Sequence, residues 1–156
     1  MRVETWVDGR SRSRRVAAAV GSTFLVVGCL GFLPGATAHV EQLHLTGPGS
    51  PSALLGIVPV TVAGNVLHLA FALAAAACHT SDARARGYLV WGGAAYAVLC
   101  ARSIAIGTGG VGVAGGGGGG LWLALAAGVG MTAAGWLCTG VRFPVVAPVA
   151  RFRHPG

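Results

Sequence analysis

The chain is short, apolar and poor in charge: it has 156 residues, of which 54% are hydrophobic and 10% are charged. Soluble domains carry about 25% charged residues, so this composition excludes a water-soluble surface and favours one that faces lipid. The formal net charge is +7, and all 11 basic residues are arginines. Because these arginines flank apolar segments, we expect anionic lipid to be their partner, and we expect no binding of nucleic acid.

Four apolar segments are long enough to cross a bilayer, whose hydrocarbon core of about 30 Å needs about 20 helical residues. We therefore predict an all-α fold, an integral membrane bundle of four transmembrane helices within residues 16–141. In chain order, the predicted helices cover about residues 16–33, 53–78, 87–106 and 120–141.

The arginines alternate between the segments that flank these helices. They occur in the N-terminal segment 1–15, in the connection between the second and third helices, and in the C-terminal segment 142–156. The other two connections contain neither arginine nor lysine. Basic residues concentrate in cytoplasmic loops, so we expect the loop with Arg84 and Arg86 and both termini in the cytoplasm. The predicted location is the inner (plasma) membrane, as a multi-pass protein.

The first apolar segment also permits a second interpretation. The arginines before it and Ala36-Thr37-Ala38 after it have the arrangement of a signal peptide with a small-residue cleavage site. The apolar segment is long for a signal peptide, so we favour a retained helix. Cleavage would leave three helices in the same orientation, and the charge pattern therefore leaves this alternative open.

The second predicted helix carries the main candidate site, formed by Thr61, Asn65 and His68. These residues fall at i, i+4 and i+7 and share one helix face, with Asn65 near the middle of the span. We expect this face to point into the bundle, because its donors would stay unsatisfied in lipid. An intramembrane histidine indicates a proton relay, a haem ligand or a quinone contact, but we favour a neutral histidine bonded to a neighbouring helix. Pro59 should kink this helix.

Two smaller polar groups lie toward the outer side. Arg102 is the only arginine within an apolar segment and can reach the membrane surface. We favour a structural role, as an ion pair with Glu41 of the first outer loop or a lipid contact, over the binding of an anion. His39, Glu41 and His44 lie close together in the sequence, but their spacing matches no zinc pattern. We therefore expect no metal site.

Small residues recur every four positions in the third and fourth helices, which is typical of closely packed transmembrane helices. They are Gly93, Ala97 and Ala101 in the third helix and Ala124, Gly128 and Thr132 in the fourth.

No GxSxG or HExxH motif occurs, and all four carboxylates lie outside the predicted helices. We therefore expect no catalytic residues, no cofactor and no enzymatic activity. The favoured function is a structural or interaction protein that associates with itself or another membrane protein through its small-residue faces. The alternative is a protein that handles a small molecule, such as a quinone or haem, or protons, at Thr61, Asn65 and His68.

Several ordered features connect the chain to a family. They are Gly28–Gly35 at the end of the first helix, Leu54-Leu55-Gly56 and Asn65–Leu69 around the second, and Ala127–Met131 in the fourth. Over about residues 16–141 the chain resembles a family of small four-helix membrane proteins, mostly actinobacterial, described as a domain of unknown function.

The resemblance implies a four-helix membrane fold and no established activity. The family usually has a histidine before the asparagine of the second helix, and this chain has Gly64 there. The family also usually opens its fourth helix with Asn-Trp-Leu-His, where this chain has Leu121, Trp122, Leu123 and Ala124. Any activity of the family that needs paired histidines is therefore expected to be absent here.

Overall fold

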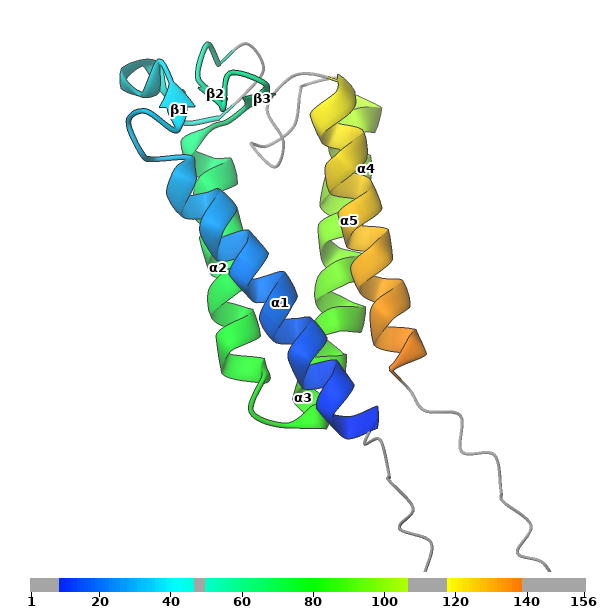
Figure 1. Cartoon of the computed structure of the whole chain (residues 1–156). Helices are drawn as coiled ribbons and strands as arrows, with labels where there is room; N and C mark the ends of the chain where they lie inside the picture. The colour runs from blue at the N-terminus through cyan, green and yellow to red at the C-terminus, as the bar shows by residue number, and fades with distance from the viewer. Residues whose placement is uncertain (1–8, 47–49, 107–117, 139–156) are drawn as a thin grey trace, which may run out of the picture.

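The computed structural model describes residues 9–46, 50–106 and 118–138 and shows a helical bundle with a small sheet at one end (Figure 1). α1 (Gly9–Leu30) lies beside α2 (Val62–Cys78), and α4 (Gly93–Ile106) lies beside α5 (Gly118–Leu137). The predicted all-α fold with four main helices is confirmed. Residues 1–8 of the predicted segment 1–15, residues 139–141 of the predicted fourth helix and the whole predicted segment 142–156 lie outside the described residues.

The third of these helices is built from three consecutive pieces. α3 (Asp82–Gly87) is followed directly by a π-helical turn, η2 (Tyr88–Gly92), and then by α4. The side chain of Ser81 caps α3 by accepting a hydrogen bond from the backbone N–H of Arg84. This continuous helix therefore begins earlier than the predicted start near residue 87.

Three helical segments are long and apolar enough to cross a membrane, judged by length and composition. They are Arg12–Leu30, Asp82–Ala105 and Gly120–Leu137. α2 is also apolar but has only 17 residues. The start of α1 and the end of α5 lie at the same end of the bundle (Figure 1), as expected for an even number of antiparallel helices.

The second helix begins at Val62, whereas the sequence predicted a start near Ala53. The intervening residues form two strands, β2 (Ala53–Leu54) and β3 (Val58–Pro59), which pair antiparallel with each other. Proline lacks the N–H that a helix needs, and β-branched residues dominate the stretch before Val62. The predicted kink at Pro59 is therefore wrong, because this proline precedes the helix.

A third strand and a short helix lie at the same end of the bundle as β2 and β3. Together these segments form what we call the cap. β1 (Thr37–Ala38) pairs antiparallel with β2, and the strand order is β1-β2-β3. A 3-10 helix, η1 (Val40–Gln42), follows β1. The cap thus consists of the segments that connect α1 to α2 and sits at the end opposite the chain's described termini (Figure 1).

The small-residue faces of α4 and α5 pack against each other within the chain. A Cβ atom added to Gly128 would lie 2.8 Å from the backbone nitrogen of Ala97, and one added to Gly93 would lie 2.6 Å from Oγ1 of Thr132. Glycine at these crossings lets the two helix backbones approach closely. The predicted close-packing faces therefore form the α4–α5 contact, although Ala101 itself is exposed.

Gly128→Ala should destabilise the protein, because the added methyl group has no room against Ala97. The expected loss is about 1–3 kcal/mol, as for overpacked cores, measured by unfolding in mixed detergent micelles. Gly130→Ala is the matched control on the same helix, since a Cβ at Gly130 meets no atom within 4 Å. Equal stability of the two variants would contradict this packing.

Candidate functional site

His68 lies on the second turn of α2 and connects the two helix pairs. Its Nε2 atom lies 3.1 Å from the hydroxyl oxygen of Tyr96 on α4, within hydrogen-bond distance. The ring of Phe24, on α1, stacks on the imidazole with a centroid separation of 5.6 Å. The expected bond from His68 to a neighbouring helix is therefore present, and it joins α2 to α4.

Two phenylalanines surround the tyrosine ring. Phe24 and Phe71 meet the ring of Tyr96 edge to face, with centroid separations of 5.2 and 5.3 Å. Tyr96 is only 2% exposed. We call Phe24, His68, Phe71 and Tyr96 the aromatic cluster; it is drawn from α1, α2 and α4.

Asn65 lies one turn before His68 and faces the end of α1. The side chain is 1% exposed, and a Cβ atom added to Gly31 would collide with its amide group. The absence of a side chain at Gly31 therefore makes the space that the Asn65 amide occupies. Both Asn65 and His68 point into the bundle, as the sequence predicted, but they lie near the start of α2 and not near the middle of a longer helix.

Thr61 has a different place from the one expected. It precedes the helix as its N-cap, and its side-chain oxygen accepts a hydrogen bond of 3.1 Å from the backbone N–H of Gly64. Caps of this kind stabilise a helix by about 1 kcal/mol. Thr61 therefore fixes the start of α2 and the positions of Asn65 and His68 that follow from it.

Two buried nitrogen atoms of the site have no hydrogen-bond partner among the described residues. They are Nδ2 of Asn65 and Nδ1 of His68. The amide nitrogen is a donor, and Nδ1 is a donor as well in the tautomer in which Tyr96 donates its hydroxyl proton to Nε2. A buried group left without a partner costs about 1–3 kcal/mol. In that tautomer the site can therefore donate two hydrogen bonds next to the rings of the aromatic cluster.

A cavity of about 290 Å³ lies between α1 and α5. Phe24 lines it and also belongs to the aromatic cluster, so this one ring contacts both the cavity and His68. The remaining lining residues are Val20, Thr23, Ala127, Gly130, Met131 and Ala134. The hydroxyl of Thr23 donates to the carbonyl of Ala19 on its own helix, which leaves the cavity largely apolar.

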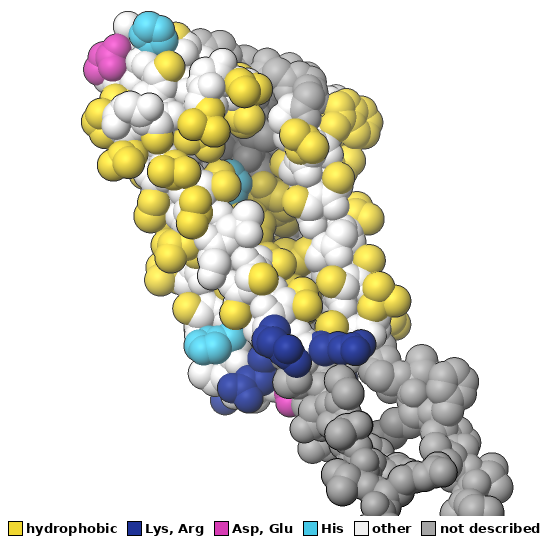
Figure 2. All heavy atoms as spheres, in the orientation of Figure 1, with side chains coloured by type: hydrophobic (Ala, Val, Ile, Leu, Met, Phe, Trp, Pro, Cys, Tyr) yellow, Lys and Arg dark blue, Asp and Glu magenta, His cyan; other side chains and the backbone are white. Residues whose placement is uncertain are grey.

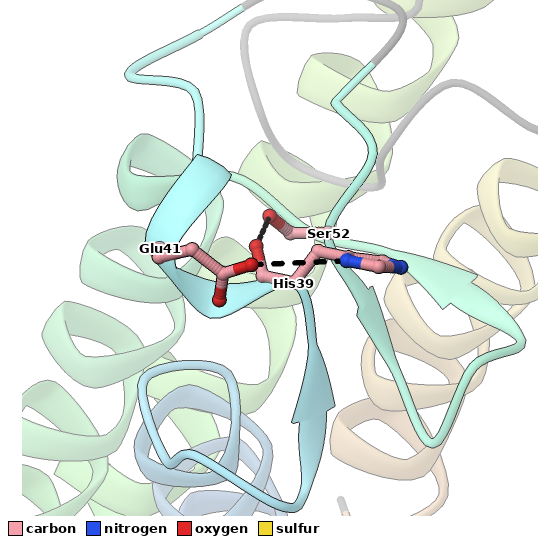
Figure 3. Close-up of polar contacts among 3 residues, drawn as sticks. All are labelled: His39, Glu41 and Ser52. Carbon is pink, nitrogen blue, oxygen red and sulfur yellow. Dashed lines mark hydrogen bonds and ion pairs between the residues drawn. The ribbon is translucent and has the colours of Figure 1, made fainter.

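The structure does not bring Arg102 and Glu41 together. The Glu41 carboxylate instead lies 3.7 Å from Nδ1 of His39, whose backbone carbonyl accepts a 2.7 Å hydrogen bond from the hydroxyl of Ser52 (Figure 3). Arg102 is exposed on α4. The described residues contain no group of three His, Cys, Asp or Glu side chains placed to hold a metal ion.

Basic side chains gather at the end of the bundle opposite the cap (Figure 2). Arg14 donates from Nε to the carbonyl of His79 at 2.9 Å, and the hydroxyl of Ser13 donates to the Asp82 carboxylate at 3.2 Å. These two bonds tie α1 to the connection between α2 and α3 and to the first residue of α3. The exposed arginines of this arginine-rich end are Arg12, Arg14, Arg15, Arg84 and Arg86.

Sequence reasoning missed the partners of His68. Tyr96 lies in the middle of an apolar segment, where a buried tyrosine hydroxyl usually needs a hydrogen-bond partner, so it offered a signal. Phe24 and Phe71 offered none, because aromatic residues are ordinary in apolar helices. For Gly31, the only signal in the sequence was its place in the glycine-rich end of the first predicted helix.

Residues 14–137 match the family described as Domain of unknown function (DUF4383). The chain belongs to this family. The match spans all four main helices and includes the aromatic cluster, so the predicted membership of a domain of unknown function is confirmed. No curated protein matches the chain, and no solved structure matches it.

In this DUF4383 protein the bond between His68 and Tyr96 should appear as an energetic coupling. A double-mutant cycle with His68→Phe and Tyr96→Phe should give a coupling of about 0.6–1.7 kcal/mol, the range of hydrogen bonds between transmembrane helices. The measurement is unfolding in mixed micelles. Tyr88→Phe is the control: it removes a tyrosine hydroxyl that donates to the carbonyl of Phe71 at 3.0 Å, and it should not couple to His68→Phe. Additive effects of the first pair would contradict the bond.

Proposed function

We propose that this chain is a plasma-membrane protein without enzymatic activity that binds a small apolar molecule beside Asn65 and His68. The observation that carries this proposal is the pair of buried nitrogens without partners, set against the aromatic cluster. The small-residue faces, which suggested self-association, are occupied by the α4–α5 contact. Binding inside the bundle therefore has more support than association through those faces.

The chemistry of the site indicates the class of ligand. Two hydrogen-bond donors favour a molecule with acceptor oxygens, and the rings of Phe24 and Tyr96 favour a flat ring system. A quinone combines both features, because its ring carries carbonyl groups. Haem has less support, because Nε2 of His68 is already within hydrogen-bond distance of Tyr96. We propose a quinone-like ring carbonyl compound as the ligand class.

A pair of matched probes tests this proposal in the purified protein. We expect 2,3-dimethyl-1,4-naphthoquinone to raise the melting temperature by several degrees at saturation, since a ligand that binds only the folded state stabilises it. The hydrocarbon 2,3-dimethylnaphthalene has the same shape without acceptor oxygens and should raise it less. Asn65→Leu should remove the difference between the probes. Val66→Leu, at an exposed position of α2, should preserve it.

Equal shifts for the two probes would contradict a role for the buried donors. A difference that persists in Asn65→Leu and in His68→Phe would place the binding elsewhere in the bundle. Because the two aromatic probes differ only in their carbonyl groups, the comparison separates hydrogen bonding from simple partitioning into apolar surface.

A second candidate function is favoured by the arginine-rich end, which we propose faces the cytoplasm and binds anionic lipid headgroups. Five exposed arginines from two distant segments meet there, and the nearby Asp82 carboxylate accepts a hydrogen bond from Ser13. Each basic residue near an anionic surface contributes about 1 kcal/mol. In this orientation the protein acts as an interaction protein at the inner leaflet, with both termini in the cytoplasm.

Native mass spectrometry from mixed phosphatidylglycerol and phosphatidylcholine bilayers tests this second function. The double variant Arg84→Gln/Arg86→Gln should retain fewer phosphatidylglycerol molecules than the wild type. Arg102→Gln is the control, because Arg102 is an exposed arginine of α4 that does not belong to the arginine-rich end. A C-terminal green fluorescent protein fusion should fluoresce, because the tail is expected in the cytoplasm. Unchanged lipid retention or a dark fusion would contradict the proposal, and oligomers in the spectra would support self-association instead.

A further inference from the structure

The cap carries an apolar hairpin that nothing in the described part of the chain covers. Leu55, Gly56 and Ile57 join β2 to β3. Leu55 is 71% exposed and Ile57 is 80% exposed. The surrounding stretch, residues 51–60, contains no charged residue. Two large apolar side chains are thus exposed at the tip of this hairpin.

The turn itself places leucine where a polar residue would suit the backbone better. The backbone N–H of Ile57 donates to the carbonyl of Leu54 at 3.0 Å, and φ is +52° at Leu55 and +70° at Gly56. Hairpin turns with two positive φ values favour Asn-Gly. A leucine with positive φ is uncommon, so the turn carries an apolar side chain at a conformational cost.

All three N–H groups of the hairpin tip are bonded inside the protein. Leu55 donates to Ala36 at 2.7 Å, Gly56 to Ala53 at 3.2 Å, and Ile57 to Leu54 at 3.0 Å, each to a backbone carbonyl. Backbone N–H and C=O groups that enter lipid need partners within the protein, because no water is present there. The three N–H groups of the tip meet this requirement.

The length of α2 supports the presence of lipid at the level of the hairpin. Its 17 residues span about 26 Å, whereas the hydrocarbon core is about 30 Å thick. The apolar band therefore continues beyond Val62 toward β3. On the neighbouring helix it continues past Leu30, since Phe32 and Leu33 are also exposed. Exposed apolar side chains thus extend from the end of α1 into the cap that carries the hairpin tip.

We propose that the tip of the β2–β3 hairpin, Leu55 to Ile57, inserts into the lipid leaflet at the capped end of the bundle. Another part of the cap is polar, because the side chains of His39 and Glu41 lie 3.7 Å apart there and are 63% and 67% exposed. A hollow of about 640 Å³ is lined by Glu41 as well as by Leu55 and Gly56. The cap is thereby divided into a wetted side and a lipid-facing side. This inference is independent of the ligand proposed above.

Spin labels on the full chain in phosphatidylcholine and phosphatidylglycerol nanodiscs test the insertion. Cys29→Ser, Cys78→Ala and Cys138→Ser remove the accessible thiols, while the buried Cys100 is retained. A label on Ile57→Cys should be more accessible to oxygen, which concentrates in lipid, than to a water-soluble nickel chelate. A label on Glu41→Cys, the control on the same cap, should show the reverse.

Three results would overturn the proposal. Equal behaviour of the two labels, with nickel access at both, would place the hairpin in water. Protection of the Ile57 label from both reagents would show that a second copy or another protein covers the tip. Lipid-like access at Glu41 as well would show that the whole cap is immersed and that the hairpin has no special role.

Discussion

Close approach of helix backbones at glycines is the constraint on which the rest of this structure depends. Helices in lipid gain no hydrophobic free energy by associating, so their packing relies on van der Waals contact and on bonds between helices. A Cβ atom added to Gly28 of α1 would lie 3.1 Å from the backbone carbonyl oxygen of Asn65 on α2, and one added to Gly128 of α5 would lie 2.8 Å from the backbone nitrogen of Ala97 on α4. Each helix pair thus contains a glycine at which the two backbones leave little room for a side chain.

The polar groups of the bundle follow from this close packing. Gly31 leaves room for the Asn65 amide, and the bond from His68 to Tyr96 and the bond from Tyr88 to the Phe71 carbonyl link α2 to the third helix. The glycine contacts set the spacing within each pair, and these tyrosine bonds connect one pair to the other. The aromatic cluster therefore lies where the two helix pairs meet.

Much of the fold could be predicted from the sequence, because its dominant signal is hydropathy. Four continuous apolar segments define the helices, and the spacing of Asn65 and His68 places both on the inward face. Hydropathy cannot separate an apolar helix from an apolar strand, however. The start of α2 was therefore misplaced, although Gly56 and Pro59 were local signals against a helix and Thr61 was a signal for a cap.

The partners within the site were harder to predict, because they depend on how helices far apart in the sequence meet. The sequence indicated that His68 needs a partner but not that Tyr96 supplies it. The prediction that Arg102 pairs with Glu41 rested on the assumption that two opposite charges toward the same end of the bundle would meet. The short cap instead holds Glu41 next to His39, its neighbour in the sequence, so local backbone geometry decided the pairing.

The position of the site along the bundle bears on the choice between binding and proton transfer. A proton relay across the membrane needs a series of ionisable groups spaced through both leaflets. His68 lies near the start of α2, close to the cap. Between it and the arginine-rich end, the hydroxyls of Tyr88 and Thr132 donate across helices to backbone carbonyls, which cannot carry a proton onward. A molecule that enters near the cap and remains there needs no such series. The geometry therefore favours a binding site in one half of the membrane over a conducting path through it.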